Sequence, residues 1–371
     1  MNNLIPTLVA EGQIQAEVNG CLGLITLNRP QALNALSLPM IRDMTALLRH
    51  WASTPQVQAV AVLGAGREGK PAAFCAGGDI RFFHQAAHAG DPALGDFFSE
   101  EYRLNHLIHG YAKPYIALMD GIVMGGGMGI SQGAKLRVLS DHSKLAMPET
   151  GIGLFPDVGG GYFLAQCPGH VGEWLALTGQ AISAGDAIEW GLGDVFVRSE
   201  HFAALAHELR HGAQPTAEHV VATVMERADL APVSAPKATL DRIDRHFGQP
   251  SVAAILESLA HADDPWAREV HATLLKRSPT MLAVTLELVR RGRHLSLADE
   301  LRLERQLVHH CFHLRGAARS ETVEGIRALA VDKDHAPRWA PATVAEVDTA
   351  EVAAFFVSPW APAEHPLRDL A

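Results

Sequence analysis

Residues 14–51 read IQAEVNGCLGLITLNRPQALNALSLPMIRDMTALLRHW, and the fold class follows from this stretch. Apolar and polar residues alternate from Ile14 to Val18, and Asn19-Gly20 is typical of a tight turn between two strands. Cys21 to Leu27 reads as the returning strand, and apolar residues then recur at helical spacing from Met40 to Trp51. The sequence therefore predicts a strand, a second strand and a helix, in that order.

The same order recurs along the first half of the chain. Ala59 to Leu63 is a short buried-strand pattern, Phe74 marks a second strand, and Asp79 to Ala89 reads as a helix. Tyr115 to Met119 and Leu136 to Leu139 are further strand patterns. Short strands that alternate with helices indicate an α/β domain. The alternation weakens near residue 197, and residues 201–314 are mostly helical in pattern, so we place a boundary near residue 200.

Composition restricts the classes of function. The 371 residues include 31 Lys+Arg and 41 Asp+Glu, so the formal net charge is −10, and the charge leaves no large basic surface for nucleic acid. Hydrophobic residues at 48% and charged residues at 19% are the balance of a globular protein. We expect neither a nucleic-acid partner nor a membrane partner, since no stretch is apolar enough to span a bilayer.

Cysteine usage and the first residues suggest a compartment. The four cysteines form no CxxC pair, which argues against a disulfide framework and a cysteine zinc site. The first twenty residues contain neither a basic start, nor a continuous apolar run, nor an arginine of the kind that transit segments use. From these features we expect a cytoplasmic protein.

One acidic residue interrupts an apolar helical stripe. Between Phe97 and Tyr111 the apolar residues define one helix face, and Glu101 falls inside it. In one interpretation, Glu101 reaches water at the edge of the stripe or pairs with Arg103 or His106. In the other, its carboxylate points into a functional site.

Three glycine-bearing segments follow strand-like patterns: Ala76-Gly77-Gly78-Asp79, Gly125-Gly126-Gly127-Met128-Gly129 and Val158-Gly159-Gly160-Gly161. Glycine lets backbone N–H groups approach a ligand, so such loops can form an oxyanion hole, but tight turns and close helix packing also use glycine. The spacing does not fit a dinucleotide-binding fingerprint.

Two further acids follow prolines among apolar residues. Glu149 lies in Met147-Pro148-Glu149-Thr150, and Asp157 ends the segment Gly153-Leu154-Phe155-Pro156-Asp157. Burial would raise the pKa of either carboxyl group toward the range used in acid and base chemistry. The alternative is that both cap helices or backbone N–H groups.

These segments resemble a known family. Asn28-Arg29-Pro30 with Ala32-Leu33-Asn34-Ala35-Leu36, and Phe74 to Ile80, resemble the crotonase (enoyl-CoA hydratase/isomerase) superfamily. Met124 to Gly127, Ala146 to Thr150 and Gly153 to Leu164 are similar to the 3-hydroxyisobutyryl-CoA hydrolases within it, and the likeness continues through Ser278-Pro279-Thr280 and residues 325–339. The resemblance implies repeated strand–strand–helix units, an acyl-CoA-binding core over residues 1–200, and a mainly helical region over 201–371 that covers the site or mediates assembly.

The resemblance also implies an activity and its residues. A short 3-hydroxyacyl-CoA, with 3-hydroxyisobutyryl-CoA of valine catabolism as the first choice, would have its carbonyl held by the N–H groups of Gly78 and Gly126. Glu149 would be the main catalytic acid, and Asp157 and Glu101 would face the acyl group. Gly126 would contact the substrate together with these three acids. No cofactor is implied beyond the CoA of the substrate, and the basic side chains at the CoA phosphates would be Arg29, Arg81 or a nearby lysine.

Position 129 separates two activities of this superfamily. Enoyl-CoA hydratases have a second glutamate two positions after the glycine triplet, and this chain has Gly129 there. Hydrolysis needs an oxyanion hole, a carboxylate that attacks or activates water, and an acid for the thiolate. We therefore predict a thioester hydrolase, with Glu149 as nucleophile or general base.

The sequence is also compatible with several alternatives. The first is an enoyl-CoA hydratase or isomerase on the same fold, and the second is a non-catalytic CoA-binding protein. A third is metal chemistry at His309 and His313, which share a helix face, although no carboxylate completes a set and Arg315 lies nearby. Another short hydroxyacyl-CoA is an alternative substrate, and the chain either assembles as a homo-oligomer or folds its C-terminal region over its own site.

Overall fold

The computed structural model describes residues 4–66 and 73–371, and the chain forms two compact units. Each unit is built from three segments that are distant in sequence. The first unit consists of Met1–Gly78, Arg103–Leu145 and Ile182–Ser234, and the second of Asp79–Tyr102, Ala146–Ala181 and Ala235–Ala371.

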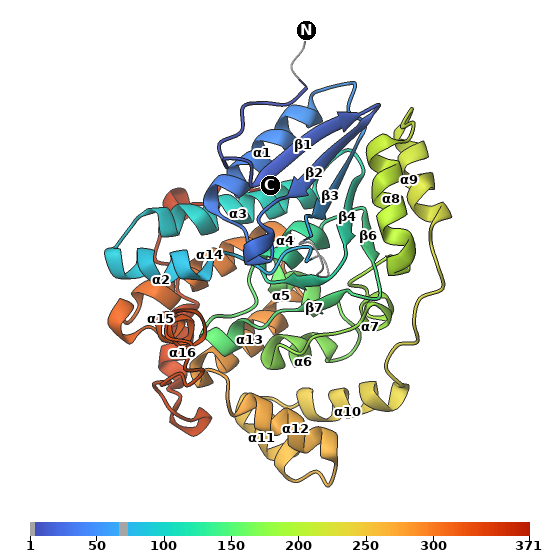
Figure 1. The fold of residues 1–371 in the computed structure, drawn as a ribbon. Helices are drawn as coiled ribbons and strands as arrows, with labels where there is room; N and C mark the ends of the chain where they lie inside the picture. Colours follow the sequence, from blue (N-terminus) through green and yellow to red (C-terminus); the bar gives the residue numbers. More distant parts are fainter. Residues whose placement is uncertain (1–3, 67–72) are drawn as a thin grey trace. The chain divides into compact units, whose positions relative to one another are not determined.

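A six-stranded sheet organises the first unit (Figure 1). Its order is β1-β2-β3-β4-β6-β8, in which β1 and β2 are antiparallel and the other neighbours are parallel. The strands of this sheet are β1 (Ile14–Asn19), β2 (Leu22–Leu27), β3 (Ala59–Gly64), β4 (Tyr115–Met119), β6 (Leu136–Leu139) and β8 (Val195–Phe196), and β5 (Ile122–Met124) pairs with β7 (Lys144–Ala146) in a second sheet. The predicted hairpin is confirmed, with Asn19 opposite Leu22.

Helices cover both faces of this sheet. Leu22 and Leu24 of β2 point toward α8 and α9 and form a buried cluster with Leu205 and Val220. Gly23, which faces the other way, lies against Trp51 of α1, and a methyl group on Gly23 would approach that ring to 2.7 Å. The helices of this unit are α1 (Leu38–Ala52), α4 (Gly126–Gln132), α7 (Ala184–Glu189), α8 (Ser199–His211) and α9 (Ala217–Glu226).

The strand expected at Phe74 is replaced by two isolated bridges. Cys75 pairs with Val123, and the neighbouring Gly78 pairs with Leu36. Gly77 has φ +108°, so the backbone turns here and no ladder extends along the segment. The units β1-β2-α1 and β4-β5-α4 follow the predicted strand–strand–helix order.

The second unit is helical. A central contact joins α5 to α13, where a methyl group on Gly292 would lie 2.1 Å from the Gly161 carbonyl oxygen. The helices are α2 (Ile80–Ala89), α3 (Ala93–His109, whose last turns belong to the first unit), α5 (Gly160–Ala165), α6 (Val171–Thr178), α10 (Lys237–Phe247), α11 (Val252–Ala260), α12 (Pro265–Leu274), α13 (Pro279–Gly292), α14 (Leu297–His313), α15 (Glu321–Ile326) and α16 (Thr349–Phe355).

The division into units differs from a boundary near residue 200. Asp79–Tyr102 and Ala146–Ala181 group with the C-terminal helices, and Ile182–Ser234 stays with the sheet. The reason is tertiary, since close contacts such as the one between α5 and α13 join segments more than a hundred residues apart. Within the described residues, no helix is long and apolar enough to cross a membrane.

Candidate active site

Glu101 is buried inside the second unit. It lies on α3, and its side chain is 2% exposed. The stripe predicted for this helix is present, since Phe97, Phe98 and Leu104 are buried. The carboxylate does not reach water, and its Oε1 has no hydrogen-bond partner among the residues described. Of the alternatives for Glu101, the structure supports a carboxylate that is turned inward.

Glu149 begins a 3₁₀ turn, Glu149–Ile152, that is closed by Gly153. Gly153 has φ +68°, and its N–H donates toward the Glu149 carbonyl. A side chain at Gly153 would collide with the Glu321 carbonyl, so glycine is required by both conformation and space. Glu149 is 7% exposed, and its Oε2 has no partner among the described residues.

Asp157 is held by a tyrosine. The Tyr102 hydroxyl donates to Asp157 Oδ2 at 2.8 Å, and both side chains are buried. Tyr102 follows Glu101 on α3, so one helix turn supplies a carboxyl group and the hydrogen-bond donor of another. The alternative for Asp157 is a cap on a helix or on a backbone N–H group. The Asp157 side chain does not cap α5, whose N-cap is Gly159, but it does bond its own backbone N–H as well as Tyr102.

Burial and mutual repulsion raise the pKa values of these acids. Burial raises the pKa of Glu101 well above its ordinary value, and the charges of Asp157 and Glu149 raise it further. Burial, and then the charge of Asp157, raise the pKa of Glu149 in the same way. Burial raises the pKa of Asp157 to about 6, although the Tyr102 hydrogen bond acts in the opposite direction. The second unit thus brings together three carboxyl groups that do not all ionise readily.

The loop after Asp157 is bound by an acid that the sequence analysis missed. Glu304 of α14 accepts the Gly159 N–H at 2.8 Å and the Gly161 N–H at 3.3 Å. Glu300, one turn earlier, lies so close to Gly161 that a methyl group there would meet its Oε1 at 2.3 Å. The loop Val158–Gly161 is one of the three candidate oxyanion loops. Its Gly159 and Gly161 N–H groups instead donate hydrogen bonds to Glu304 of the protein itself.

Glu300 and Glu304 are fully buried. Burial raises the pKa of Glu300 to about 7, and the nearby charge of Asp157 raises it too. Burial and the charge of Glu300 raise the pKa of Glu304 well above its ordinary value. The sequence did contain a signal for these two residues. Glu300 and Glu304 are acids four residues apart on one helix face with apolar neighbours, which is the kind of exception that pointed to Glu101.

The remaining predicted donors, Gly78 and Gly126, belong to the first unit. Gly126 is the first residue of α4, so its N–H has no acceptor within that helix. The loop before Gly78 runs beside it, since a methyl group on Gly77 would lie 3.8 Å from the Gly126 nitrogen. Gly127 is needed for packing, because a side chain there would meet the Cys75 carbonyl oxygen at 2.3 Å.

The basic and histidine side chains predicted for CoA and metal binding mostly contact other parts of the protein. Arg29 donates to the Ala35 carbonyl at 3.2 Å, and Arg81 is exposed on α2. His309 and His313 stack, with ring centroids 4.3 Å apart and planes at 11°. The described part of the chain contains no group of three or more His, Cys, Asp or Glu side chains arranged to hold a metal ion.

Comparison with known proteins identifies the family. The enoyl-CoA hydratase/isomerase family model matches residues 22–356, and the chain belongs to this family. A 3-hydroxyisobutyryl-CoA hydrolase, mitochondrial, from Rattus norvegicus is 40% identical, with 93% of this chain and 89% of the relative covered.

Two solved structures have the same fold. A carnitinyl-CoA dehydratase from Mycobacterium thermoresistibile superimposes with a TM-score of 0.85 at 39% identity, covering 93% of this chain and 96% of that one. An enoyl-CoA hydratase from Rhodobacter sphaeroides 2.4.1 gives 0.83 at 37% identity, covering 94% and 98%. The predicted α/β crotonase-like fold, with repeated strand–strand–helix units and a mainly helical C-terminal region, is confirmed.

The expectation of a cytoplasmic protein is contradicted. The curated relatives are named as mitochondrial proteins, which points to the mitochondrion instead. A targeting segment is separate from the folded body and is removed after import, so the composition of the body does not record the compartment.

Proposed function

We propose that this protein hydrolyses the thioester of a short 3-hydroxyacyl-CoA, with 3-hydroxyisobutyryl-CoA as the first choice and valine catabolism as the setting. The single observation that carries the proposal is the group formed by Glu101, Glu149 and Asp157. These carboxyl groups are buried together, and none has an ion-pair partner among the described residues. The curated hydrolase at 40% identity supports the same reaction.

In the proposed reaction, water and the thioester give a carboxylate and the CoA thiol. The N–H groups of Gly78 and Gly126 donate hydrogen bonds to the carbonyl oxygen and stabilise the negative charge of the tetrahedral intermediate. Each such donor contributes roughly 3 kcal/mol to lowering the barrier. Backbone donors suit this role because they need no reorganisation as the charge develops.

Glu149 then acts by one of two routes. Either its carboxylate attacks the carbonyl carbon and water cleaves the resulting anhydride, or it takes a proton from the water that attacks. A carboxylate whose pKa is raised by burial is a stronger base than an exposed one, which supports both routes. Asp157 orients water or passes a proton to the leaving thiolate.

Glu101 is assigned to substrate selection. A buried hydroxyl group needs a hydrogen-bond partner, and an inward carboxylate with an unpartnered oxygen offers one to the 3-hydroxyl of the acyl group. A site built for that hydroxyl discriminates strongly against acyl groups that lack it. The proposal therefore predicts that 3-hydroxyisobutyryl-CoA is cleaved faster than isobutyryl-CoA.

Hydration of an enoyl-CoA is the second candidate function. The solved structures of a dehydratase and a hydratase favour it. Gly129 argues against hydration. This glycine lies on α4 at the position where the enoyl-CoA hydratases of this superfamily have their second glutamate. A glycine supplies no group to share the added water.

One assay separates these functions. Incubation with 3-hydroxyisobutyryl-CoA and a thiol reagent is expected to release CoA, and crotonyl-CoA is expected to be left unchanged. Glu149→Gln should abolish CoA release while it retains CoA binding. Glu321→Gln is the matched control, since Glu321 is also buried but is bonded to Ser278 outside the acid group.

Two results would overturn the proposal. Consumption of crotonyl-CoA without release of CoA from the hydroxyacyl thioester would favour the hydratase. Cleavage by Glu149→Gln at the rate of an active wild type would remove the catalytic assignment. CoA binding by a wild type without thioester cleavage would favour a CoA-binding protein.

A further inference from the structure

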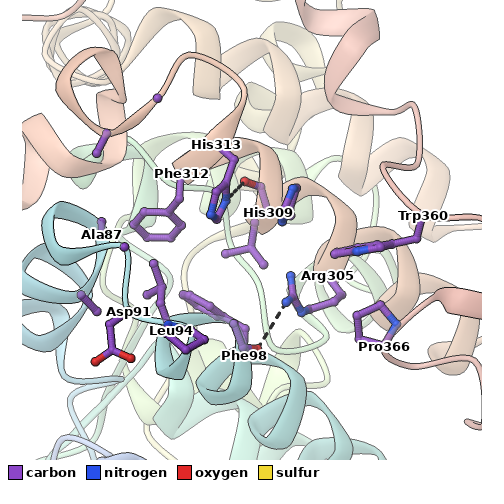
Figure 2. A pocket seen from close by; sticks show the side chains of 17 residues that line it. Ala87, Asp91, Leu94, Phe98, Arg305, His309, Phe312, His313, Trp360 and Pro366 are labelled. Carbon is purple, nitrogen blue, oxygen red and sulfur yellow. Dashed lines mark hydrogen bonds between the residues drawn. The ribbon is translucent and has the colours of Figure 1, made fainter.

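A cavity of about 430 Å³ lies within the second unit, formed by α2, α3, α14 and the C-terminal segment (Figure 2). None of the predicted catalytic or oxyanion residues lines it. Its volume lies in the range of small-molecule sites. Phe98 and Phe312 form part of an apolar wall, with ring centroids 5.9 Å apart.

Arg305 supplies a buried positive charge in this wall. Its side chain is 6% exposed, and the guanidinium donates to Ser99 Oγ at 2.9 Å and to the Gly95 carbonyl at 3.3 Å. Both partners are neutral, and no carboxylate lies within ion-pair distance of Arg305 in the described part of the chain. A guanidinium has five N–H donors, so three have no recorded acceptor.

The room around this guanidinium depends on a glycine. A methyl group on Gly95 of α3 would come within 3.3 Å of Arg305 Nη2. Burying a cation that has no contacting carboxylate is costly, and burial lowers the pKa of Arg305 to about 10, although the charges of Tyr102 and Asp96 act in the opposite direction. The Arg305 guanidinium is therefore the place in the cavity wall where a bound anion would be most favourable.

Flat rings border the same place. Trp360 lies 4.9 Å from the Arg305 guanidinium carbon, and its ring centroid is 4.9 Å from that of His309. His309 stacks in turn on His313. Figure 2 shows Trp360 and His309 near the Arg305 end of the cavity. Aromatic walls of this kind favour a planar apolar group.

The other charges of the lining fix which end takes an anion. Asp91 is the acidic residue of the lining, and Figure 2 shows it across the cavity from Arg305. Burial, with the charges of His313 and Arg305, lowers the pKa of His309 to about 4, so its ring is neutral at neutral pH and offers an N–H without a charge. An anion is favoured at Arg305 and disfavoured at Asp91.

We propose that this cavity binds a small organic carboxylate with a planar apolar body, with the carboxylate on Arg305 and the body packed against the aromatic side chains. A carboxylate matches the flat fork of a guanidinium, and the apolar wall rewards the rest of the molecule. A bare anion would satisfy Arg305 but would leave the apolar wall wet. This site is independent of the proposed thioester hydrolysis.

Calorimetric titration of the full chain with phenylacetate tests the proposal. We expect saturable binding that is weakened about tenfold or more in Arg305→Gln and when phenylacetamide replaces phenylacetate. Trp360→Leu, which leaves Arg305 and its hydrogen bonds in place, should weaken phenylacetate binding several-fold. Arg291→Gln is the matched control, because Arg291 stacks on Phe356 at 4.1 Å outside this cavity, and its binding should equal that of the wild type.

Three outcomes would overturn the proposal. The first is no saturable binding of phenylacetate up to about 10 mM, a limit beyond which affinity is negligible. The second is equal binding of phenylacetamide or of inorganic phosphate, which would show that the charge or the apolar body is not recognised. The third is unchanged phenylacetate binding in both of two single variants, Trp360→Leu and Arg305→Gln. If Arg305→Gln does not fold, Arg305→Lys replaces it.

Discussion

The loops Gly125–Gly127 and Gly159–Gly161 have the same composition and different partners. In the first, Gly126 begins α4 with an N–H that its helix does not use, and Gly127 allows contact with the Cys75 carbonyl. In the second, Glu304 accepts the N–H groups of Gly159 and Gly161. A glycine loop therefore becomes a ligand site or a structural joint according to which acceptor reaches its amides.

The largest expected effect is that of removing one amide proton from the first loop. Proline is tolerated at the first position of a helix, so Gly126→Pro should keep α4 and lose the N–H. We expect kcat for CoA release to fall by about 10²–10³-fold. Gly126→Ala, which keeps the N–H, is the control, and circular dichroism checks the fold. Wild-type turnover in Gly126→Pro would exclude this amide as an oxyanion donor.

The second loop is expected to respond through stability. Glu304→Ala removes the acceptor of two buried N–H groups, and leaving a buried donor unsatisfied costs about 1–3 kcal/mol. We therefore expect the free energy of unfolding to fall by about 3 kcal/mol in urea titrations, and by less in Glu304→Gln, which keeps one acceptor oxygen. A loss below about 1 kcal/mol would contradict the structural role.

Tyr102→Phe should shift the pH dependence of the acid group. The Tyr102 hydrogen bond holds the pKa of Asp157 down against burial, so its loss raises that pKa above about 6. If ionised Asp157 is the working form, the acidic limb of the kcat profile moves to higher pH, by about one unit, and activity recovers at alkaline pH. Tyr111→Phe, whose hydroxyl donates to the Leu48 carbonyl, is the control. If the acidic limb of the kcat profile does not shift in Tyr102→Phe, the ionisation of Asp157 does not control that limb.

The smallest expected effect is at Cys75, which lies beside the first loop and invites the interpretation of a nucleophile. Its carbonyl, not its thiol, makes the contact with Gly127, and Sγ lies 3.6 Å from the Gly77 carbonyl oxygen. Cys75→Ala should keep CoA release within about twofold of the wild type while it loses about 1 kcal/mol of stability. A large loss of turnover without a loss of stability would return the thiol to the mechanism.

Local patterns predicted much of the fold correctly. The hairpin, α1, β3 and β4 follow from apolar runs, alternation or helical spacing, because their apolar residues are buried between the sheet and its covering helices. The inward Glu101 was visible as an exception to such a pattern. Phe74 was misjudged, because the backbone turns at Gly77 and leaves Cys75 with a single bridge.

The partners of the acids could not be predicted in this way. Glu304 binds amides about 145 residues earlier in the chain, and Tyr102 binds Asp157 across 55 residues. Neither pairing has a local periodicity. The cavity at Arg305 likewise depends on Gly95, more than two hundred residues away.

The sequence by itself determined the order of strands and helices, the family, and the chemical groups available, because these depend on local spacing and on motifs. Only the tertiary structure decided which glycine amides are occupied by Glu304 and which carboxyl groups share a buried environment. It also decided that the segments 79–102 and 146–181 join the C-terminal helices. The physical reason is that hydrogen bonding and desolvation act between groups close in space, whatever their separation along the chain.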